Sequence, residues 1–566
     1  MNTVEFNVPI PAPPEEIHAY NTTPTAAPVA FVNQKLKAAK LPAMKLEATI
    51  HAARTAGAAG APDEVHAVVN QTTGEAHLVP SLAKLVTAGM PLSHHNRQLR
   101  AAHAAGQAAL KDSRFVAKDA TTLQAADGIQ LLGAKTGGRA NAEPEVMLTL
   151  VPAIRHAGGL RVYGAGSKAM IALDNKNSVV GALRRWHTAT LGEKIQRTIT
   201  VPQVRAEIER QLTPNVPADA KAVVDVVTHG YYDAHGSFLQ PIYRFEANLV
   251  RSSDSRIFAR IGGYIPMGKA LEPIPDLTTR PAGAAPTLAG QFPFFQQVGG
   301  GKAPEVHPEA NMPGSTGGAK PVVTVGEFVN QDWPNNPAYI DMANHFLSGL
   351  TSINGAVTYS RTLWWTAYSW QVNGPNSKYF MNAVNIAYTV PHGDWLLNTC
   401  LSNYGDLWYV NKIGVGGNPG FGAAAGGSLS TWVIMSCEVI PSFYDRQHEV
   451  GGDGNGQHAF DAWWGVFQGM HSAVGFRTVM WYPDDDTNYS FGQLAAQGFD
   501  VVTAWFQAVA AHHASEGTYI DGHINQSVRY DRASAMVDAR NLGQPIYNVT
   551  PQTKATQLWN FWMNNL

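Results

Sequence analysis

Two residues of the types that cysteine peptidases use follow two short apolar segments in the last third of this sequence. The segment 384–390 (VNIAYTV) is followed closely by His392, and the segment 431–435 (TWVIM) by Cys437. Runs this short, rich in β-branched and aromatic residues, are typical of buried strands in a parallel sheet. Ligands of such sheets bind beyond the carboxyl ends of the strands, and neighbouring strands lie about 5 Å apart. If the two strands are adjacent, an imidazole and a thiol can act on one substrate.

Hydrolysis of an amide through a thiol needs a thiolate nucleophile, a proton carrier for the leaving amine and donors that stabilise the tetrahedral oxyanion. Cys437 is the candidate nucleophile and His392 the candidate proton carrier. The backbone N–H groups of Gly393 and Cys437 are the candidate oxyanion donors, because a glycine has no Cβ to block close approach. The pattern therefore predicts a Cys-His dyad that hydrolyses peptide bonds.

Each half of this pair also has a simpler interpretation. Cysteine is often buried in protein cores, and His392 with Gly393 can form a turn that ends a strand. Cys400 and Cys437 are the only cysteines, too few for a disulfide framework, although one bridge between them is possible. These interpretations predict an inactive protein used for binding or assembly, with a Trp-rich surface as its interface. The dyad also fits hydrolysis of another ester or amide, which the sequence does not distinguish.

Four regions of different composition must position these residues. Residues 1–140 combine a Pro-rich arm with an Ala-rich region of helical periodicity, and residues 141–262 have an α+β pattern. Residues 263–320 are rich in Pro and Gly, which predicts an exposed linker that proteases can cut. Residues 321–566 alternate strand and helix patterns, which predicts an α/β domain with a mainly parallel sheet covered by helices on both faces.

Particular elements of this last region can be predicted from periodicity. Residues 322–328 and 475–481 read as strands of the same sheet as the two segments above. Helices are expected over 338–350, 460–470 and 494–512, where apolar residues recur at helical spacing. The fold class that follows is α/β, preceded by an Ala-rich and α+β N-terminal region.

Residues 322–514 resemble the caspase-like cysteine peptidases, the group that includes caspases, legumain and gingipain. The resemblance rests on a His-Gly pair that closes one apolar strand (His392) and a Ser-Cys pair that closes the next (Cys437). It is closest to an uncharacterised bacterial family in which an aromatic helix and a Gly-Leu-His-like turn follow, here Trp463-Trp464 and Gly469-Met470-His471. The resemblance implies a three-layer sandwich, a Cys437–His392 dyad with no obligatory third member, and thiol-dependent endopeptidase activity on peptides or proteins.

The N-terminal half is a candidate for a removable cover. Residues 321–566 contain 9 Lys and Arg against 18 Asp and Glu, and the preceding residues contain 32 against 25. The two parts therefore carry about −9 and +7 charges and should attract each other. The segment around Gly166 to Trp186, which contains a predicted hairpin over 169–183, resembles the small hairpin-and-helix domains found in propeptides of secreted bacterial peptidases. These features predict a zymogen that processes itself, with a plain packing domain as the alternative.

Specificity and processing have candidate residues as well. Asp484, Asp485 and Asp486 follow a predicted strand, and they can line a pocket for a Lys or Arg side chain or form a solvated acidic loop. With an acidic pocket, basic residues of the linker become candidate self-processing sites, namely Arg280, Lys302 and Lys320.

No metal or cofactor is predicted. The calcium-like loop that starts at Asp453 has Trp464 in the twelfth position, where a bidentate Glu is required. The formal net charge of −2 gives no reason to expect nucleic acid or a membrane surface as a partner. The start of the chain has no secretory signal pattern, which predicts a soluble cytoplasmic protein and leaves secretion by another route open. The sequence leaves the oligomeric state open.

Overall fold

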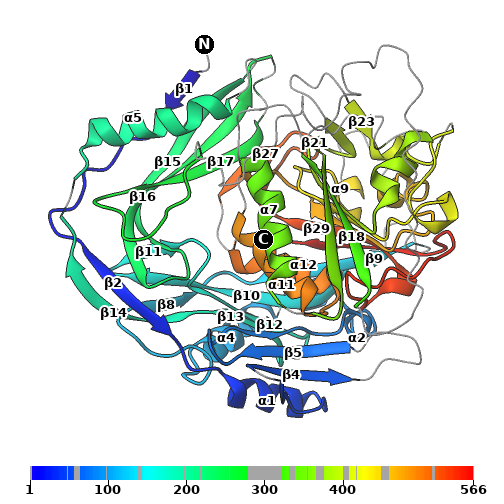
Figure 1. Ribbon diagram of the computed structural model, residues 1–566, viewed down its shortest axis with the longest axis horizontal. Coiled ribbons are helices and arrows are strands. Elements are labelled where there is room, and N and C mark those ends of the chain that lie inside the picture. The colour runs from blue at the N-terminus through cyan, green and yellow to red at the C-terminus, as the bar shows by residue number, and fades with distance from the viewer. Residues whose placement is uncertain are drawn as a thin grey trace.

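The structure is a computed structural model of the 566-residue chain, and it is an α/β fold built on a large, partly parallel sheet (Figure 1). The residues that the structure describes are 3–47, 49–55, 64–96, 98–136, 143–196, 198–216, 220–253, 255, 257–277, 320–329, 338–353, 355–364, 372, 375–399, 407–415, 417–447, 458–482, 485–512 and 517–564. None of the helices among them has the length and apolar character needed to cross a lipid bilayer.

Five parallel strands form the part of the sheet that carries the candidate dyad. Their spatial order is β19 (Thr358–Trp364), β18 (Val322–Val329), β20 (Ile386–Val390), β24 (Thr431–Ile434) and β25 (Ser472–Phe476). Every residue of β20, β24 and β25 is buried, as expected for parallel strands with both faces covered. The strands predicted over 322–328, 384–390 and 431–435 are therefore confirmed.

The sheet continues without a break into the N-terminal half of the chain. Strand β29 (Ala533–Asp538) pairs antiparallel with β25, and β30 (Leu558–Met563) pairs with β29. The other edge of β30 pairs antiparallel with β9 (Ile129–Lys135), which in turn pairs with β10 (Glu145–Ala157). The two compositional halves thus share one sheet, so their association depends on backbone hydrogen bonds as well as on any attraction between net charges.

A second group of N-terminal strands lies beside the part of the molecule that holds the parallel strands (Figure 1). It consists of the long antiparallel strands β15 (Ala220–Asp233), β16 (Phe238–Arg251) and β17 (Ile257–Pro266), with helix α5 (Val201–Leu212) packed against β17. Strand β17 also pairs in parallel with the short β26 (Trp481–Tyr482) of the C-terminal half. This layer therefore joins the two halves a second time, next to the candidate site.

The remaining helices and strands complete both halves. In chain order they are β1 (Thr3–Phe6), β2 (His18–Pro24), α1 (Val29–Ala38), β3 (Lys45–Glu47), β4 (Ile50–Thr55), β5 (Glu64–Asn70), β6 (Ala76–Leu78), α2 (Leu82–Leu85), β7 (Met90–Pro91), α3 (Leu92–Asn96), α4 (Leu99–Leu110), β8 (Thr122–Ala125), β11 (Leu160–Tyr163), β12 (Lys168–Leu173), β13 (Val179–Arg185), β14 (His187–Lys194), α7 (Ala338–Thr351), β21 (His392–Asp394), β22 (Leu397–Thr399), β23 (Leu407–Tyr409), α9 (Phe443–Gln447), α10 (His458–Asp461), α11 (Asp485–Ala496), α12 (Val501–His512), β27 (Thr518–Asp521) and β28 (Gln526–Arg529).

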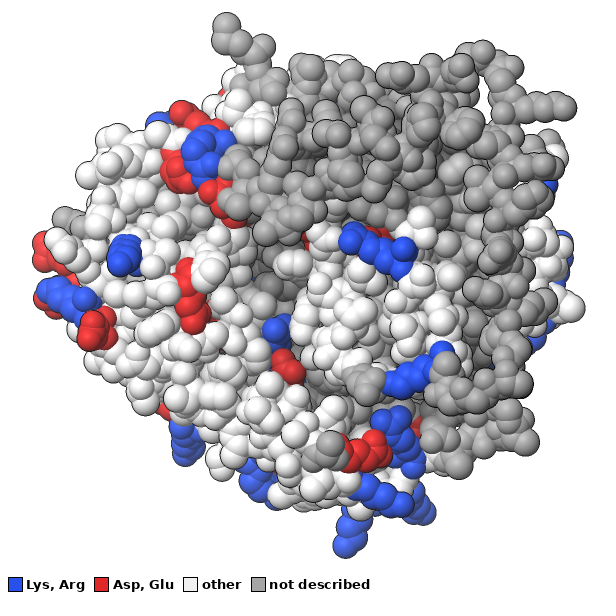
Figure 2. All heavy atoms as spheres, viewed as in Figure 1, with Lys and Arg blue, Asp and Glu red and all other residues white. Residues whose placement is uncertain are grey.

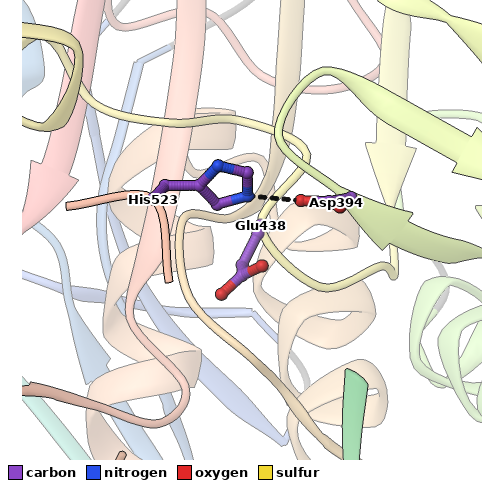
Figure 3. A group of neighbouring side chains, drawn as sticks. All are labelled: Asp394, Glu438 and His523. Atoms are coloured by element: carbon purple, nitrogen blue, oxygen red, sulfur yellow. Dashed lines mark hydrogen bonds and ion pairs between the residues drawn. The ribbon is translucent and has the colours of Figure 1, made fainter. Parts of the chain in front are cut away.

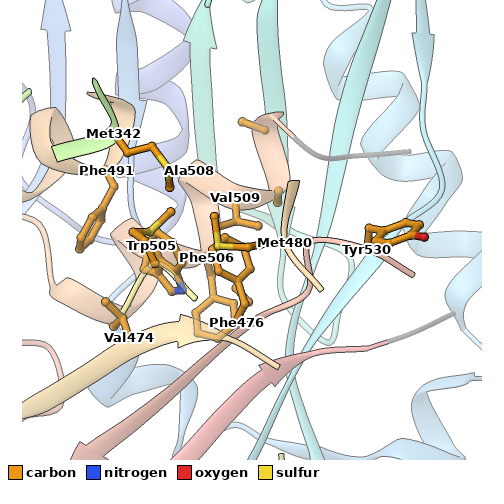
Figure 4. Packing of buried hydrophobic residues seen from close by; sticks show 14 of the residues in the cluster. Met342, Val474, Phe476, Met480, Phe491, Trp505, Phe506, Ala508, Val509 and Tyr530 are labelled. Carbon is orange, nitrogen blue, oxygen red and sulfur yellow. The ribbon is translucent and has the colours of Figure 1, made fainter. Parts of the chain in front are cut away.

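Helix α12 forms the centre of the main hydrophobic core, and all twelve of its residues are buried. It contacts strands of both halves, among them β10 and β12 as well as β25 and β29. Trp505 packs edge-on against Phe476 and Phe491 with ring centroids 5.2 Å apart in each pair (Figure 4). The indole N–H of Trp505 donates to the carbonyl of Gly475 at 3.0 Å. A helix that is apolar on all sides is stable only in such an interior position.

Charged side chains are dispersed over the surface that Figure 2 shows. Lys and Arg stand singly or in small groups on the described part of this face, several of them beside Asp or Glu. Among the described residues, Arg529 of the C-terminal half forms an ion pair with the exposed Asp127 of the N-terminal half at 3.7 Å. Asp127 lies in the half with net positive charge, and Arg529 lies in the half with net negative charge. Attraction between the net charges of the halves therefore does not explain this pair. Exposed pairs of this kind contribute little to stability, about 0–1 kcal/mol.

Several elements differ from the predictions. The Ala-rich part of residues 1–140 is helical in α1 and α4, but β4, β5 and β9 show that much of it is strand. The helix expected over 460–470 is only α10. The helix expected over 494–512 is two helices, because Gly498 has a φ of +95° and breaks the chain between α11 and α12. The hairpin of β12 with β13, helix α5 and helix α7 agree with the sequence.

Asp500 caps α12 and is the source of a pH-dependent prediction. Its Oδ1 accepts the backbone N–H groups of Val502 and Thr503 at 3.1 and 2.9 Å. Burial raises the pKa of Asp500 from 3.8 to about 7, against the lowering effect of these N–H donors. A carboxyl with a raised folded-state pKa contributes stability that is full below about pH 4 and is lost as the pH rises towards 7.

Asp500→Asn should therefore stabilise the protein at pH 8 and leave its stability unchanged near pH 4. Asparagine keeps the capping oxygen without the buried charge. At about 1.4 kcal/mol per pKa unit, the free energy of unfolding should rise by at most about 4 kcal/mol at pH 8. Urea denaturation of both proteins at the two pH values measures the difference. A gain of equal size at pH 4 and pH 8 would show that the charge of Asp500 is not its cause.

Candidate active site

The two strands that lead to the candidate dyad are neighbours. Strand β20 pairs in parallel with β24 in the register Thr389 opposite Ile434, and the N–H of Met435 donates to the carbonyl of Thr389 at 2.8 Å. Parallel neighbours end at the same edge of a sheet, so His392 and Cys437 leave the sheet side by side. The expected adjacency of the two strands is therefore observed, while the catalytic roles of the two residues remain a prediction.

Gly393 is the point at which the His segment touches the Cys segment. It lies in β21, which folds back antiparallel on β22. A Cβ placed on Gly393 would lie 2.1 Å from Oγ of Ser436 and 2.2 Å from the carbonyl oxygen of Cys437. The two main chains thus approach more closely than any side chain allows, which is a physical reason for glycine at this position.

Gly393→Ala should consequently displace one of the two segments. A forced contact of this size typically costs about 1–3 kcal/mol, because the atoms that it meets are a backbone carbonyl and the hydroxyl of a buried serine. We expect a lower urea midpoint for Gly393→Ala than for the wild type. Any peptide cleavage that depends on Cys437 and His392 should also be lost. Gly517→Ala is a suitable control, since the nearest atom to its Cβ is 4.0 Å away. An unchanged midpoint for Gly393→Ala would refute the close contact.

Cys437 is a free thiol that the structure keeps away from solvent. Only 4% of its surface is exposed, and its Sγ accepts the N–H of Met480 at 3.4 Å. Burial raises the pKa of the Cys437 thiol well above its usual range, and the carboxylates of Glu438, Asp531 and Asp394 raise it further. In this conformation the sulfur is a neutral thiol, which is a poor nucleophile.

His392 is buried in the same way, with 7% of its surface exposed. Burial lowers the pKa of His392 from 6.5 to about 3, and the positive charge of Arg251 acts in the same direction. The imidazole is therefore neutral at physiological pH and cannot donate the second proton that an imidazolium would carry. Arg251 is the last residue of β16, so the N-terminal half influences this histidine electrostatically.

Strand β17 of the N-terminal half contacts the chain next to the site. The N–H of Arg260 in β17 is directed to the carbonyl of Met480 at 3.4 Å, while the N–H of Met480 binds the sulfur of Cys437. The guanidinium of Arg260 donates hydrogen bonds to Asp225 at 3.0 Å and to Asn248 at 2.9 Å. It also lies 4.6 Å from the ring centroid of Tyr530. Met480 is thus bound on one side to Cys437 and on the other side to β17.

Sequence reasoning missed a cluster of ionisable residues beside the dyad. Asp394 lies two residues after His392, and Glu438 directly follows Cys437. His523 lies in the turn between β27 and β28. His523 Nε2 is 2.6 Å from Oδ1 of Asp394, and Glu438 lies directly beside this pair (Figure 3). The two acids could have been noticed from their positions next to the dyad, but no local pattern marks His523.

The other predicted site residues are only partly described. Asp485 begins helix α11, whereas Asp484 lies outside the described residues, and the side chains of Asp485 and Asp486 are not described. The proposed acidic specificity pocket therefore remains a prediction. Cys437 is a free cysteine, so the alternative of a bridge to Cys400 is wrong for this structure.

The predicted processing region is mostly outside the described residues as well. Arg280 and Lys302 belong to the undescribed part, and Lys320 is exposed, with its ammonium group 2.6 Å from the carbonyl of Gly355. The self-processing sites therefore remain predictions.

Comparisons with known proteins give a domain match and no activity. Residues 341–534, which include His392, Cys437 and the cluster of Asp394, Glu438 and His523, match a domain of unknown function (DUF6345). No curated protein matches the sequence. A solved structure of an uncharacterized protein from Eubacterium rectale ATCC 33656 is similar at 8% sequence identity and a TM-score of 0.25, over 47% of this chain and 88% of that chain. A likeness this weak supports no conclusion about fold or function.

Proposed function

We propose that this chain is a cysteine endopeptidase with a caspase-like C-terminal domain, held inactive by its own N-terminal half. Cys437 attacks the scissile carbonyl, and His392 takes the thiol proton and delivers it to the leaving amine. The observation that carries the proposal is the placement of these residues beyond the ends of adjacent parallel strands, β20 and β24. The close approach of Gly393 to the main chain of Cys437 supports it, because it puts the segments of both candidate oxyanion donors side by side.

The burial of both residues is what a zymogen requires. A peptide substrate binds proteases in an extended form, and an exposed strand edge can receive it through main-chain hydrogen bonds. Strand β26, which directly follows the Cys437-bound Met480, has such an edge, and β17 occupies it. Departure of β17 would admit water, and the pKa values of His392 and Cys437 would return towards 6.5 and 9. Both groups would then be able to exchange protons near neutral pH.

The linker offers a route to this opening. Strand β17 ends at Pro266, and the Pro- and Gly-rich residues up to 320 follow it directly. Cleavage there would leave β17 with a free end, and its pairing with β26 involves only two residue pairs, Arg260 with Trp481 and Ile261 with Tyr482. Because β9 and β30 still join the halves, the cover would open without leaving the molecule.

The test is cleavage of a peptide library before and after limited proteolysis within residues 267–320. We expect the intact chain to be inactive and the nicked chain to cut peptides, with complete loss of cutting after iodoacetamide treatment of the nicked protein. Cutting that resists alkylation would exclude a thiol nucleophile, and a nicked chain with an exposed but inactive Cys437 would exclude the peptidase.

A second candidate function is a catalytically inactive binding or assembly protein. It is favoured by the carboxylates around Cys437, which oppose formation of the thiolate in the closed structure. The same experiment separates the two, because an inactive protein gives no cleavage even when Cys437 becomes reactive to iodoacetamide.

A further inference from the structure

Three segments that lie far apart in the sequence bring two carboxylates and one imidazole together at the rim of the dyad. Asp394 ends β21, Glu438 lies in the turn after β24, and His523 lies in the turn of the β27–β28 hairpin. The ligand atoms of the three side chains all lie within 4.8 Å of one another. Figure 3 shows the imidazole of His523 facing the carboxylate of Asp394, with the side chain of Glu438 next to this pair. This spacing is compatible with simultaneous coordination of one metal ion.

Neighbouring groups hold these side chains in place. The phenol of Tyr519 donates to Oε1 of Glu438 at 2.6 Å. The indole of Trp395 stacks on the imidazole of His523 with a centroid distance of 4.4 Å and an interplanar angle of 18°. The carboxylate of Asp521 accepts the backbone N–H of His523 at 2.8 Å and fixes the hairpin turn. Outer contacts of this type orient the ligands in metal sites.

Two buried polar atoms next to the cluster have no hydrogen-bond partner among the described residues. They are Oγ of Ser436 and Nε1 of Trp395, in residues with 1% and 8% of their surfaces exposed. Ser436 lies against Gly393, the neighbour of Asp394, and Trp395 covers His523. A buried polar atom without a partner is costly and indicates water or an ion that completes the site. The waters of a hydrated cation would supply such partners.

The cluster also has an entry path for an ion. The side chains of Asp394 and His523 are 18% and 26% exposed, whereas Glu438 is 3% exposed. Glu438 therefore forms the floor of the site, and the other two form its partly open rim. Three protein ligands leave coordination positions for water, which is the arrangement of metal sites that remain accessible.

We propose that Asp394, Glu438 and His523 bind one divalent transition-metal cation of the Zn²⁺ or Mn²⁺ type. One imidazole nitrogen with two carboxylate oxygens suits these ions, whereas Ca²⁺ and Mg²⁺ prefer sites of oxygen ligands alone. The two carboxylates and the imidazole together offer three ligand atoms to one cation. The bound ion links the β21 turn, the turn after Cys437 and the β27–β28 hairpin. The proposal does not depend on peptidase activity.

The experiment titrates the full chain, freed of metal with EDTA, with Zn²⁺ by calorimetry and with Mn²⁺ by electron paramagnetic resonance. We expect one equivalent to bind and to raise the thermal midpoint of unfolding. His523→Gln and Glu438→Gln should each weaken binding roughly 100-fold or more, and loss of the outer contact in Tyr519→Phe should weaken it roughly 10-fold. His103→Gln, on helix α4, is the matched control and should bind like the wild type.

Circular dichroism and urea denaturation without metal establish that each variant is folded. Absence of binding, binding of Ca²⁺ in place of Zn²⁺ and Mn²⁺, or full binding by folded His523→Gln protein would each overturn the proposal. Co²⁺ substitution adds a spectroscopic check, since a thiolate-to-cobalt charge-transfer band would place the ion on Cys437 instead. Cys437→Ala should bind metal as the wild type does, so failure of the peptidase proposal and failure of the metal proposal give different results.

Discussion

Cys437→Ala should abolish peptide cleavage by the opened protein and leave its fold intact. Removal of the nucleophile from a thiol or serine hydrolase typically lowers the rate by roughly 10⁴-fold or more, because no other group forms the acyl intermediate. The substitution removes one sulfur atom from a packed site and should cost only about 1 kcal/mol in stability. The measurement is the cleavage rate of the peptide that the library identifies, with circular dichroism as the check on folding.

Cys400→Ala is the matched control, since the chain has only these two cysteines. It should keep its activity, and iodoacetamide should still inactivate it. His392→Ala should also be inactive while retaining a reactive Cys437 in the opened protein. Cleavage by Cys437→Ala at the wild-type rate would remove this residue from the mechanism and with it the proposed peptidase.

The second large effect concerns access to the thiol. In the intact Cys400→Ala chain, iodoacetamide should modify Cys437 at least ~100-fold more slowly than in the urea-unfolded chain, because alkylation needs an exposed thiolate. The basis is the 4% exposure of Cys437 and the upward shift of its thiol pKa by burial. Mass spectrometry of the alkylated fraction against time measures both rates.

A substitution in β17 should remove much of this protection. A Cβ on Gly262 would lie 2.5 Å from Nε1 of Trp481, so Gly262→Val forces β17 away from β26. We expect Gly262→Val, in the same Cys400→Ala chain, to be alkylated at least ~10-fold faster than its parent. Gly517→Val adds the same atoms where the nearest neighbour is 4.0 Å away and should react as slowly as the parent. Fast alkylation of the unsubstituted native chain would show that β17 is not a cover.

Local patterns in the sequence were sufficient for the elements that carry the dyad. The apolar runs of β18, β20 and β24 and the helical spacing of α7 are properties of neighbouring residues, and each of these elements is present. The sequence interpretation required β20 and β24 to be adjacent, and the pairing of these strands in the structure meets that condition. The helix predicted over 494–512 failed at Gly498, because apolar spacing alone does not report a left-handed backbone.

The candidate cluster shows what local patterns omit. His523 contacts Asp394 across 129 positions of sequence, and it also stacks on the neighbouring Trp395. No periodicity relates a hairpin turn to the end of a strand so far away, since only the packing of the two elements creates the contact. The same holds for Arg251, whose charge lowers the pKa of His392 from another region of the chain.

By itself, the sequence determined that β20 and β24 are strands and that a histidine and a cysteine follow them. It also determined the α/β class, since strand and helix patterns are written in contiguous residues. Only the tertiary structure decided that β9 and β30 join both halves in one sheet and that β17 pairs with β26, directly after the residue that bonds the thiol. Pairing between strands that are distant in sequence depends on tertiary contacts. The burial that sets the protonation of Cys437 and His392 exists only once these strands have paired.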